Sequence, residues 1–156
     1  MSYLGDLRKI VGHRELLSVG ATLAVFREGK ILLQLRADTQ NWGFPGGSME
    51  LGETVEEAGI RELAEETGMK AEKLTPVHIF SGKDFFCVYP NGDALWSVAI
   101  LYVVEDAQGD PTISDNESLK LQFFSLDDLP DMEPRAKAMI GWIREHADEI
   151  IPEKCR

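Results

Sequence analysis

Three closely spaced glutamates, Glu62, Glu65 and Glu66, are the residues of this chain whose type and spacing best suit chemistry. If their segment is helical, a rotation of about 100° per residue gathers the three carboxylates on one side. Carboxylates this close repel one another, and like charges four residues apart weaken an isolated helix. A hard divalent cation such as Mg²⁺ would offset this repulsion, because it takes oxygen ligands and is often shared between carboxylates and substrate phosphates. The alternative is an acidic helix face that points into solvent.

The sequence around these glutamates predicts a helix with a defined start and end. Thr54 suits the N-cap position, and Glu57 three residues later completes a capping box. Gly68 is a stop signal. Small or apolar residues form the side opposite the glutamates, so we expect that side to pack; they are Ile60, Leu63, Ala64 and Thr67.

A glycine-rich turn leads into this helix, with the sequence NWGFPGG over Asn41 to Gly47. The turn and helix together resemble the Nudix hydrolases, whose signature is G-x5-E-x7-R-E-U-x-E-E-x-G-U, where U is a bulky apolar residue. The chain fills every fixed position of this signature, with Gly47, Glu53, Arg61, Glu62, Leu63, Glu65, Glu66, Gly68 and Met69. Such a match is far more specific than a lone glycine-rich loop.

The resemblance implies roles for individual residues. Glu62, Glu65 and Glu66 are the expected metal ligands, and the backbone carbonyl of Gly46 is a further oxygen ligand. Arg61 and Glu53 are expected to pair with each other or with the ligand carboxylates, and so to hold the geometry of the site. An ordinary surface ion pair is the alternative for these two residues.

A further glutamate is expected from the polar loop over residues 106–117. In several family members a loop glutamate joins the metal site, so Glu117 is the candidate, with a surface loop residue as the alternative. Glu62 and Glu117 are both candidates for the general base, since the resemblance does not determine which of them takes the proton.

The activity that the resemblance implies is metal-dependent hydrolysis of a nucleoside diphosphate linked to another moiety X. The products are a nucleoside monophosphate and phosphorylated X, with Mg²⁺ as cofactor and Mn²⁺ as its substitute. Two other functions stay open. One is a non-catalytic nucleotide-sensing module on the same fold, because fold does not determine function. The other is a pyrophosphohydrolase acting on RNA 5′ ends.

Composition narrows the class of partner. The 156 residues carry a net charge of −11 and are 44% hydrophobic, which suits one domain over residues 1–156, with a short helical extension at about residues 1–12. Nucleic-acid affinity comes largely from phosphate neutralisation, and no basic face is evident. We therefore expect a small nucleotide-type diphosphate as partner, and no long nucleic acid. Without a long apolar run or signal peptide, we expect no membrane contact and a cytoplasmic protein. The resemblance is compatible with a homodimer.

The elements that must position the site follow from hydrophobic periodicity. Strands are predicted over Leu17–Phe26, Ile31–Leu35, Leu74–Phe80, Phe85–Tyr89, Leu95–Val104 and Leu119–Phe124, and a closing helix after Pro134. Pro76 confines its strand to an edge or a strand start, and the apolar run to Val104 predicts a central strand. These patterns indicate only a mixed α and β domain. The resemblance implies an α/β fold with a mixed β-sheet sandwiched between α-helices.

Some side chains outside the signature are further candidates for substrate contact. Arg36 ends a strand just before the glycine-rich turn, where its guanidinium could reach a phosphate or simply face solvent. Four aromatic residues could stack on a base, although strand aromatics more often belong to the core; they are Phe85, Phe86, Tyr89 and Trp96.

Overall fold

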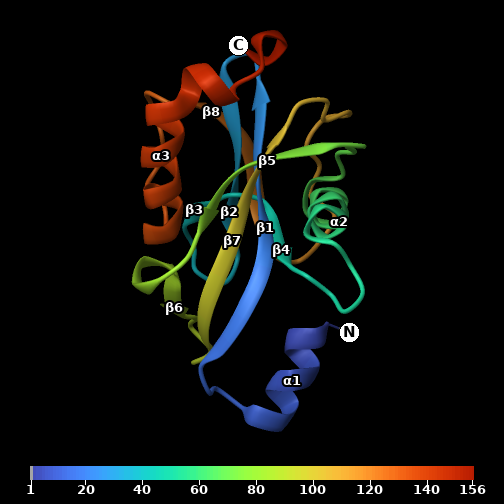
Figure 1. The fold of residues 1–156 in the computed structure, drawn as a ribbon, viewed down its shortest axis with the longest axis vertical. Helices are drawn as coiled ribbons and strands as arrows, with labels where there is room; N and C mark the ends of the chain where they lie inside the picture. Colours follow the sequence, from blue (N-terminus) through green and yellow to red (C-terminus); the bar gives the residue numbers. More distant parts are fainter. Residues whose placement is uncertain (1) are drawn as a thin grey trace.

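The computed structural model describes residues 2–156 and places a curled, mixed β-sheet between helices on its two faces (Figure 1). The helices are α1 (Tyr3–Val11), α2 (Val55–Thr67) and α3 (Pro134–Ile150), with 3₁₀ turns η1 (Lys83–Phe85) and η2 (Glu153–Cys155). The strands are β1 (Leu16–Arg27), β2 (Lys30–Arg36), β3 (Trp42–Gly43), β4 (Gly46–Ser48), β5 (Leu74–Phe80), β6 (Phe86–Val88), β7 (Ala94–Val104) and β8 (Ser118–Ser125). The predicted fold class is confirmed.

The sheet is mixed because its two longest strands run parallel. β1 and β7 pair from Leu16 opposite Leu95 to Val25 opposite Val104. The other strand pairs are antiparallel, and the main path through the sheet is β3-β2-β1-β7-β5. β7 is therefore internal, as its apolar run predicted. β5 is at an edge, as Pro76 predicted, and its register shifts just after that residue.

The hairpin partner of β1 diverges soon after the turn, and this opens the sheet near the glycine-rich segment. β1 and β2 pair only at Phe26 opposite Ile31 and at Arg27 opposite Lys30. Earlier along β1, β4 takes the place of β2, with Gly46 opposite Thr22. The segment predicted as a simple turn thus contains β3 and enters β4, so its backbone is held against the sheet.

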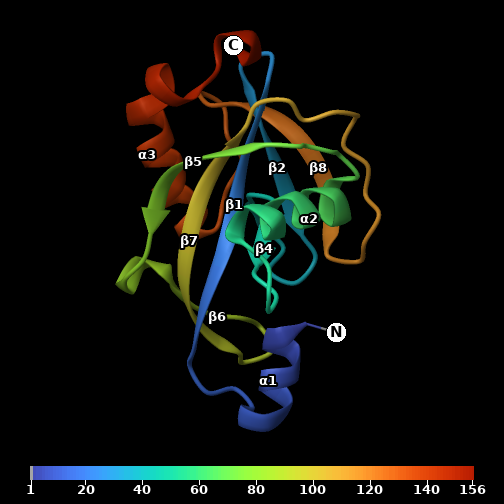
Figure 2. The same ribbon diagram turned by 45° about the vertical axis from the view of Figure 1, so that its right-hand side comes forward.

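Helix α2 covers one face of the sheet (Figure 2). Its predicted capping box is present, because the Thr54 hydroxyl accepts from the Glu57 N–H and the Glu57 carboxylate accepts from the Thr54 N–H. Gly68 ends the helix in the left-handed conformation, as predicted. The cluster of apolar residues beneath α2 includes Leu63 from the helix and Leu23 from β1, both fully buried.

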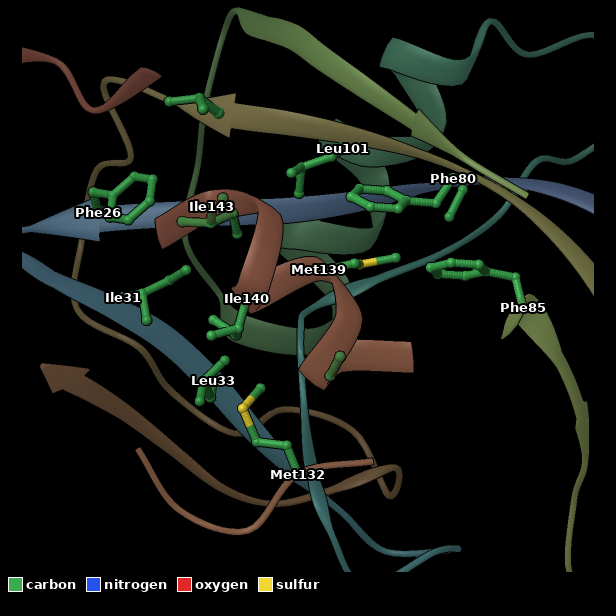
Figure 3. Close-up of a cluster of buried hydrophobic side chains, with 14 of the residues drawn as sticks. Phe26, Ile31, Leu33, Phe80, Phe85, Leu101, Met132, Met139, Ile140 and Ile143 are labelled. Atoms are coloured by element: carbon green, nitrogen blue, oxygen red, sulfur yellow. The ribbon is translucent and has the colours of Figure 1, made fainter. Parts of the chain in front are cut away.

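Helix α3 covers the opposite face, above the larger core. Figure 3 shows Met139, Ile140 and Ile143 of this helix directed at apolar side chains of the strands, among them Ile31 and Leu101. Pro134 is the first residue of the helix, where its missing N–H costs no hydrogen bond. The sheet is therefore buried on both faces over its central part.

The helical N-terminal extension is present as α1, although Met1 lies outside the described residues. Ser2 caps it, and the Tyr3 N–H donates to the Glu50 carboxylate at 2.8 Å, which ties α1 to the loop that precedes α2. No residue of α1 is buried. None of the helices within residues 2–156 has the length and apolar character needed to cross a membrane.

Candidate active site

Two glutamates of α2 lie against the backbone of Gly46 and Gly47. The Glu66 Oε2 accepts a hydrogen bond from the Gly46 N–H at 2.8 Å, and Glu66 is only 2% exposed. On the other side, a Cβ atom added to Gly47 would fall 2.5 Å from Cδ of Glu62. A residue without a side chain is therefore required at position 47 for the Glu62 carboxylate to lie where it does.

The predicted packing face of α2 is partly wrong. Ala64 is exposed and Ile60 only half-buried, whereas Glu66 is buried beside Leu63. Contact with the sheet is centred on Gly59, where an added Cβ would meet the Leu74 side chain at 2.6 Å. Glu66 is only about 20° from Gly59 around a helix of 3.6 residues per turn. The carboxylate therefore enters the sheet side of the helix, where the Gly46 N–H compensates for part of its desolvation.

Arg61 joins three of the predicted site carboxylates. Its Nε and Nη2 donate to the two carboxylate oxygens of Glu53 at 2.5 and 3.0 Å, which is a bidentate pair. Its Nη1 donates to Glu62 at 2.9 Å and to Glu65 at 3.3 Å. The predicted pair of Arg61 with Glu53 is present, and so are contacts of Arg61 with two predicted ligands.

Glu117 approaches the site from the loop between β7 and β8. Burial raises the pKa of both Glu62 and Glu66, and the charge of Glu117 adds to both increases. The loop is attached to α2 at two points, since the Ser114 hydroxyl donates to the Glu65 carbonyl and the Thr112 N–H donates to the Thr67 carbonyl. Glu117 itself is exposed.

Burial and mutual repulsion make negative charge unfavourable in the centre of the site. Burial raises the pKa of Glu66 to about 8, against the opposing effect of the Gly46 N–H, and the charges of Glu62 and Glu117 add to the rise. Burial also raises the pKa of Glu62, although Arg61 opposes this change. At the margin, the hydrogen bond from Arg61 lowers the pKa of Glu53 to about 2.

The donor atoms fit a hard divalent cation, although the carboxylates do not surround a common point. Among residues 2–156, no three carboxylate, imidazole or thiolate side chains converge as a ready metal site. Arg61 holds Glu62 and Glu65, and Gly46 holds Glu66. Carboxylate and carbonyl oxygens are nevertheless the ligands that Mg²⁺ and Mn²⁺ prefer. The space kept free at Gly47 brings two of these carboxylates to one stretch of backbone.

A cavity of about 140 Å³ adjoins this backbone, lined in part by Gly46 and Gly47. Arg36 lines it and forms a bidentate pair with Asp38 at 2.9 and 2.7 Å. Burial lowers the pKa of this guanidinium, but the hydrogen bond and charge of Asp38 outweigh that effect and raise it. Arg36 thus lies in a wall of the cavity, and its contact with a phosphate stays a prediction.

Sequence reasoning missed Arg135, which lines the same cavity from the start of α3. Its Nη2 donates to Glu133 at 2.9 Å, and its guanidinium carbon lies 5.7 Å from the centre of the Tyr89 ring. The only sequence signal near Arg135 was the predicted start of a helix after Pro134, and that signal says nothing about substrate contact. No periodicity could show that this end of α3 returns to the glycine-rich segment.

The four aromatic candidates have different surroundings. Phe85 and Tyr89 line the cavity. Phe86 and Trp96 pack against each other instead, with ring centres 4.6 Å apart on strands β6 and β7. Of the four candidates, Tyr89 and Phe85 therefore line the cavity beside Gly46, together with Phe44 of the glycine-rich segment.

Comparison with known proteins places this geometry in a family. The family model described as NUDIX domain matches residues 16–143. An ADP-ribose pyrophosphatase of Methanocaldococcus jannaschii is 35% identical over 125 residues, which cover 74% of this chain and 69% of that protein. A putative 8-oxo-dGTP diphosphatase of Bacillus subtilis is 39% identical over 67 residues, or 42% of this chain and 45% of that protein. A crystal structure of a MutT NUDIX hydrolase from Burkholderia pseudomallei has a TM-score of 0.69 and 30% identity, covering 81% of this chain and 97% of that one.

Proposed function

This chain belongs to the NUDIX domain family as a pyrophosphohydrolase, and we propose that it uses a divalent cation to cleave a nucleoside diphosphate sugar of the ADP-ribose kind. The products would be a nucleoside monophosphate and a sugar phosphate. The main support for this proposal is that Glu62 and Glu66 lie against the backbone of Gly46 and Gly47. The same backbone lines a cavity that Arg36 and Arg135 also line. This arrangement supports a site where one bound diphosphate lies between the glutamate carboxylates and the two arginine guanidinium groups.

The three helix glutamates are the proposed ligands of the cation, which would be Mg²⁺ or, as a substitute, Mn²⁺. When bound, it supplies an activated water and charge stabilisation at the phosphoryl oxygens. Glu62 and Glu65 each accept from Arg61 Nη1 through one oxygen, which leaves the other oxygen of each carboxylate for the cation. Arg61 also keeps its bidentate pair with Glu53, and so orients α2 against the loop.

Glu117 and Arg36 have distinct proposed roles. Glu117 is exposed on a loop that is anchored to α2, so its carboxylate can take a proton from a water molecule beside Glu62. Glu62 stays the other candidate for the base. Arg36 lies in the cavity with its orientation held by Asp38 through Nε and Nη2, so its Nη1 can bind an oxygen of the substrate.

The test is product release from a panel of ADP-ribose, other nucleotide sugars, oxidised nucleoside triphosphates and triphosphorylated RNA, with Mg²⁺ and with chelator. We expect metal-dependent cleavage of ADP-ribose to AMP and ribose phosphate. The double variant Glu65→Gln with Glu66→Gln should stay folded and lose more than the roughly 10–100-fold typical of removing an outer partner of a metal ligand. Near-normal turnover by the folded double variant would refute the ligand assignment.

The same panel separates hydrolysis from the two other functions. A sensing module would show a higher melting temperature with a nucleotide and no product. An enzyme for RNA 5′ ends would release pyrophosphate from RNA in preference to cleaving the sugar nucleotides. The net charge of −11 disfavours the second of these, because the chain offers no evident basic face for the RNA backbone.

A further inference from the structure

A second and larger cavity lies on the other side of α2 from the glycine-rich backbone. Its volume is about 830 Å³, and no residue lines both this cavity and the one beside Gly46. Ile60 and Ala64 of α2 form one wall, and the segment from Lys70 to Lys73 forms another. The volume falls within the range of about 300–1,000 Å³ that is usual for ligand pockets.

Two parts of the cavity wall belong to the elements that carry the candidate catalytic glutamates. Ile60 and Ala64 share α2 with Glu62, Glu65 and Glu66. The segment 105–108 also lines the cavity, and it begins the loop that ends at Glu117. Arg27 fixes that loop through hydrogen bonds to the carbonyls of Ala107 and Gly109, at 3.2 and 2.7 Å. A molecule bound here would therefore contact both elements at once.

The charge of the lining differs from that of the rest of the chain. Four acidic and four basic side chains line the cavity and balance one another, so the whole net charge of −11 lies outside it. Of the basic residues, Arg27 is paired with Asp110 and Lys154 with Asp106. Lys70 and Lys73 have no ion-pair partner within residues 2–156.

The apolar part of the lining comes from α2 and from segments next to it. Ile60 is half-buried and Ala64 exposed, although both lie on the apolar side of the helix. The lining also includes Phe26 and Ala71, which are buried, and the half-buried Ala107. The cavity thus offers an apolar surface next to two unpaired ammonium groups.

We propose that this cavity is a second ligand site, which binds a small organic anion with a flat apolar body and is coupled to the active site through α2 and the loop 105–117. The anionic group pairs with Lys70 and Lys73, and the body packs on Ile60 and Ala64. The unpaired acids Glu28 and Glu72 in the same lining disfavour a polyphosphate, so the ligand carries one or two negative charges. Only the coupling to turnover depends on the proposed hydrolase function.

The binding test uses anilinonaphthalene sulfonate, an aromatic monoanion whose fluorescence rises in apolar sites, titrated into the whole protein without substrate. Two variants alter the site. The double variant Lys70→Glu with Lys73→Glu reverses the charge of the two unpaired ammonium groups, and Ala64→Trp fills the cavity with an indole ring. Matched controls are Lys30→Glu with Lys120→Glu, and Ala138→Trp, which make the same changes at exposed positions outside the cavity. Thermal melts establish that each variant is folded.

We expect the charge-reversed variant to raise the dissociation constant about tenfold or more, the loss typical when contacts to a charged group are removed. Ala64→Trp should raise it as well, because the indole occupies the space that the body of the dye needs. The controls should stay near the wild-type value. Cavity variants that bind like the wild type would overturn the proposal, because the dye would then be on another apolar surface. Binding at the cavity that leaves the KM and kcat of a cleaved diphosphate unchanged would overturn the coupling alone. If no diphosphate is cleaved, the proposed function fails and the binding result still stands.

Discussion

Replacing Gly47 with alanine should remove most activity while the fold stays intact. A Cβ atom at this position would lie 2.5 Å from Cδ and 3.0 Å from Cγ of Glu62. Carbon atoms in contact are normally about 3.5–4.0 Å apart, so the Glu62 carboxylate must retreat by about 1 Å. A misplacement of about 1 Å in a catalytic group can cost roughly 100-fold in rate, or about 2.7 kcal/mol of transition-state stabilisation.

The stability of Gly47→Ala should change much less than its activity. The clash involves the end of the Glu62 side chain, which can rotate, and the backbone at Gly47 is not in the left-handed region. The contact of Glu62 with Arg61 would be disturbed, but ion pairs near the surface contribute only about 0–1 kcal/mol. The melting temperature should therefore fall by no more than about 2–4 °C.

The assay is steady-state cleavage of the best substrate from the diphosphate panel with Mg²⁺, together with thermal melts. Gly141→Ala in α3 is the matched control, because nothing lies within 4 Å of an added Cβ there. That control should keep its activity. Its free energy of unfolding should rise by about 0.5–1 kcal/mol, because alanine is more stable than glycine inside a helix. A folded Gly47→Ala protein with a wild-type kcat would refute the inference that Glu62 must lie on the Gly46–Gly47 backbone.

Two further predictions concern the N-cap of α2 and the arginine that joins α2 to Glu53. Thr54→Ala removes the hydroxyl that accepts the Glu57 N–H in the capping box, so the free energy of unfolding should fall by about 1 kcal/mol. Thermal melts should show this as a fall in melting temperature of about 2–4 °C, and an unchanged melt would argue that the cap contributes nothing. Arg61→Lys keeps the charge but cannot form the bidentate contact with Glu53, so kcat should fall about 10–100-fold in the same kinetic assay, and a wild-type kcat would show that the fork geometry is unimportant.

Local signals in the sequence predicted the elements well. Asn91-Gly92 is a strong hairpin signal in the sequence, and the Gly92 N–H donates to the Tyr89 carbonyl in the turn between β6 and β7. Pro76 indicated an edge strand because proline lacks the N–H that a central strand needs. Each of these signals acts within a few residues, so it can be read without knowledge of the tertiary structure.

Contacts between distant segments could not be read in this way. The parallel pairing of β1 with β7 joins residues about 80 positions apart, and no local pattern specifies it. The same holds for Arg135, which reaches the glycine-rich segment because α3 crosses the opposite face of the sheet. The family signature identified the glutamates of α2, but it contains no residue of the cavity wall formed by Phe85, Tyr89 and α3.

Gly59 explains both the error in the predicted packing face and the cavity on the far side of α2. An added Cβ there would meet side chains of β5 and β1, with Leu74 at 2.6 Å and Leu23 at 3.2 Å, so the helix approaches the sheet most closely at its glycine. Helix periodicity weighs apolar side chains and gives glycine no weight, so it placed the contact at Ile60 and Ala64. With the contact line through Gly59 instead, Glu66 turns toward Gly46, while Ile60 and Ala64 turn toward the second cavity. One residue without a side chain thus buries a catalytic candidate and leaves an apolar wall open for a ligand.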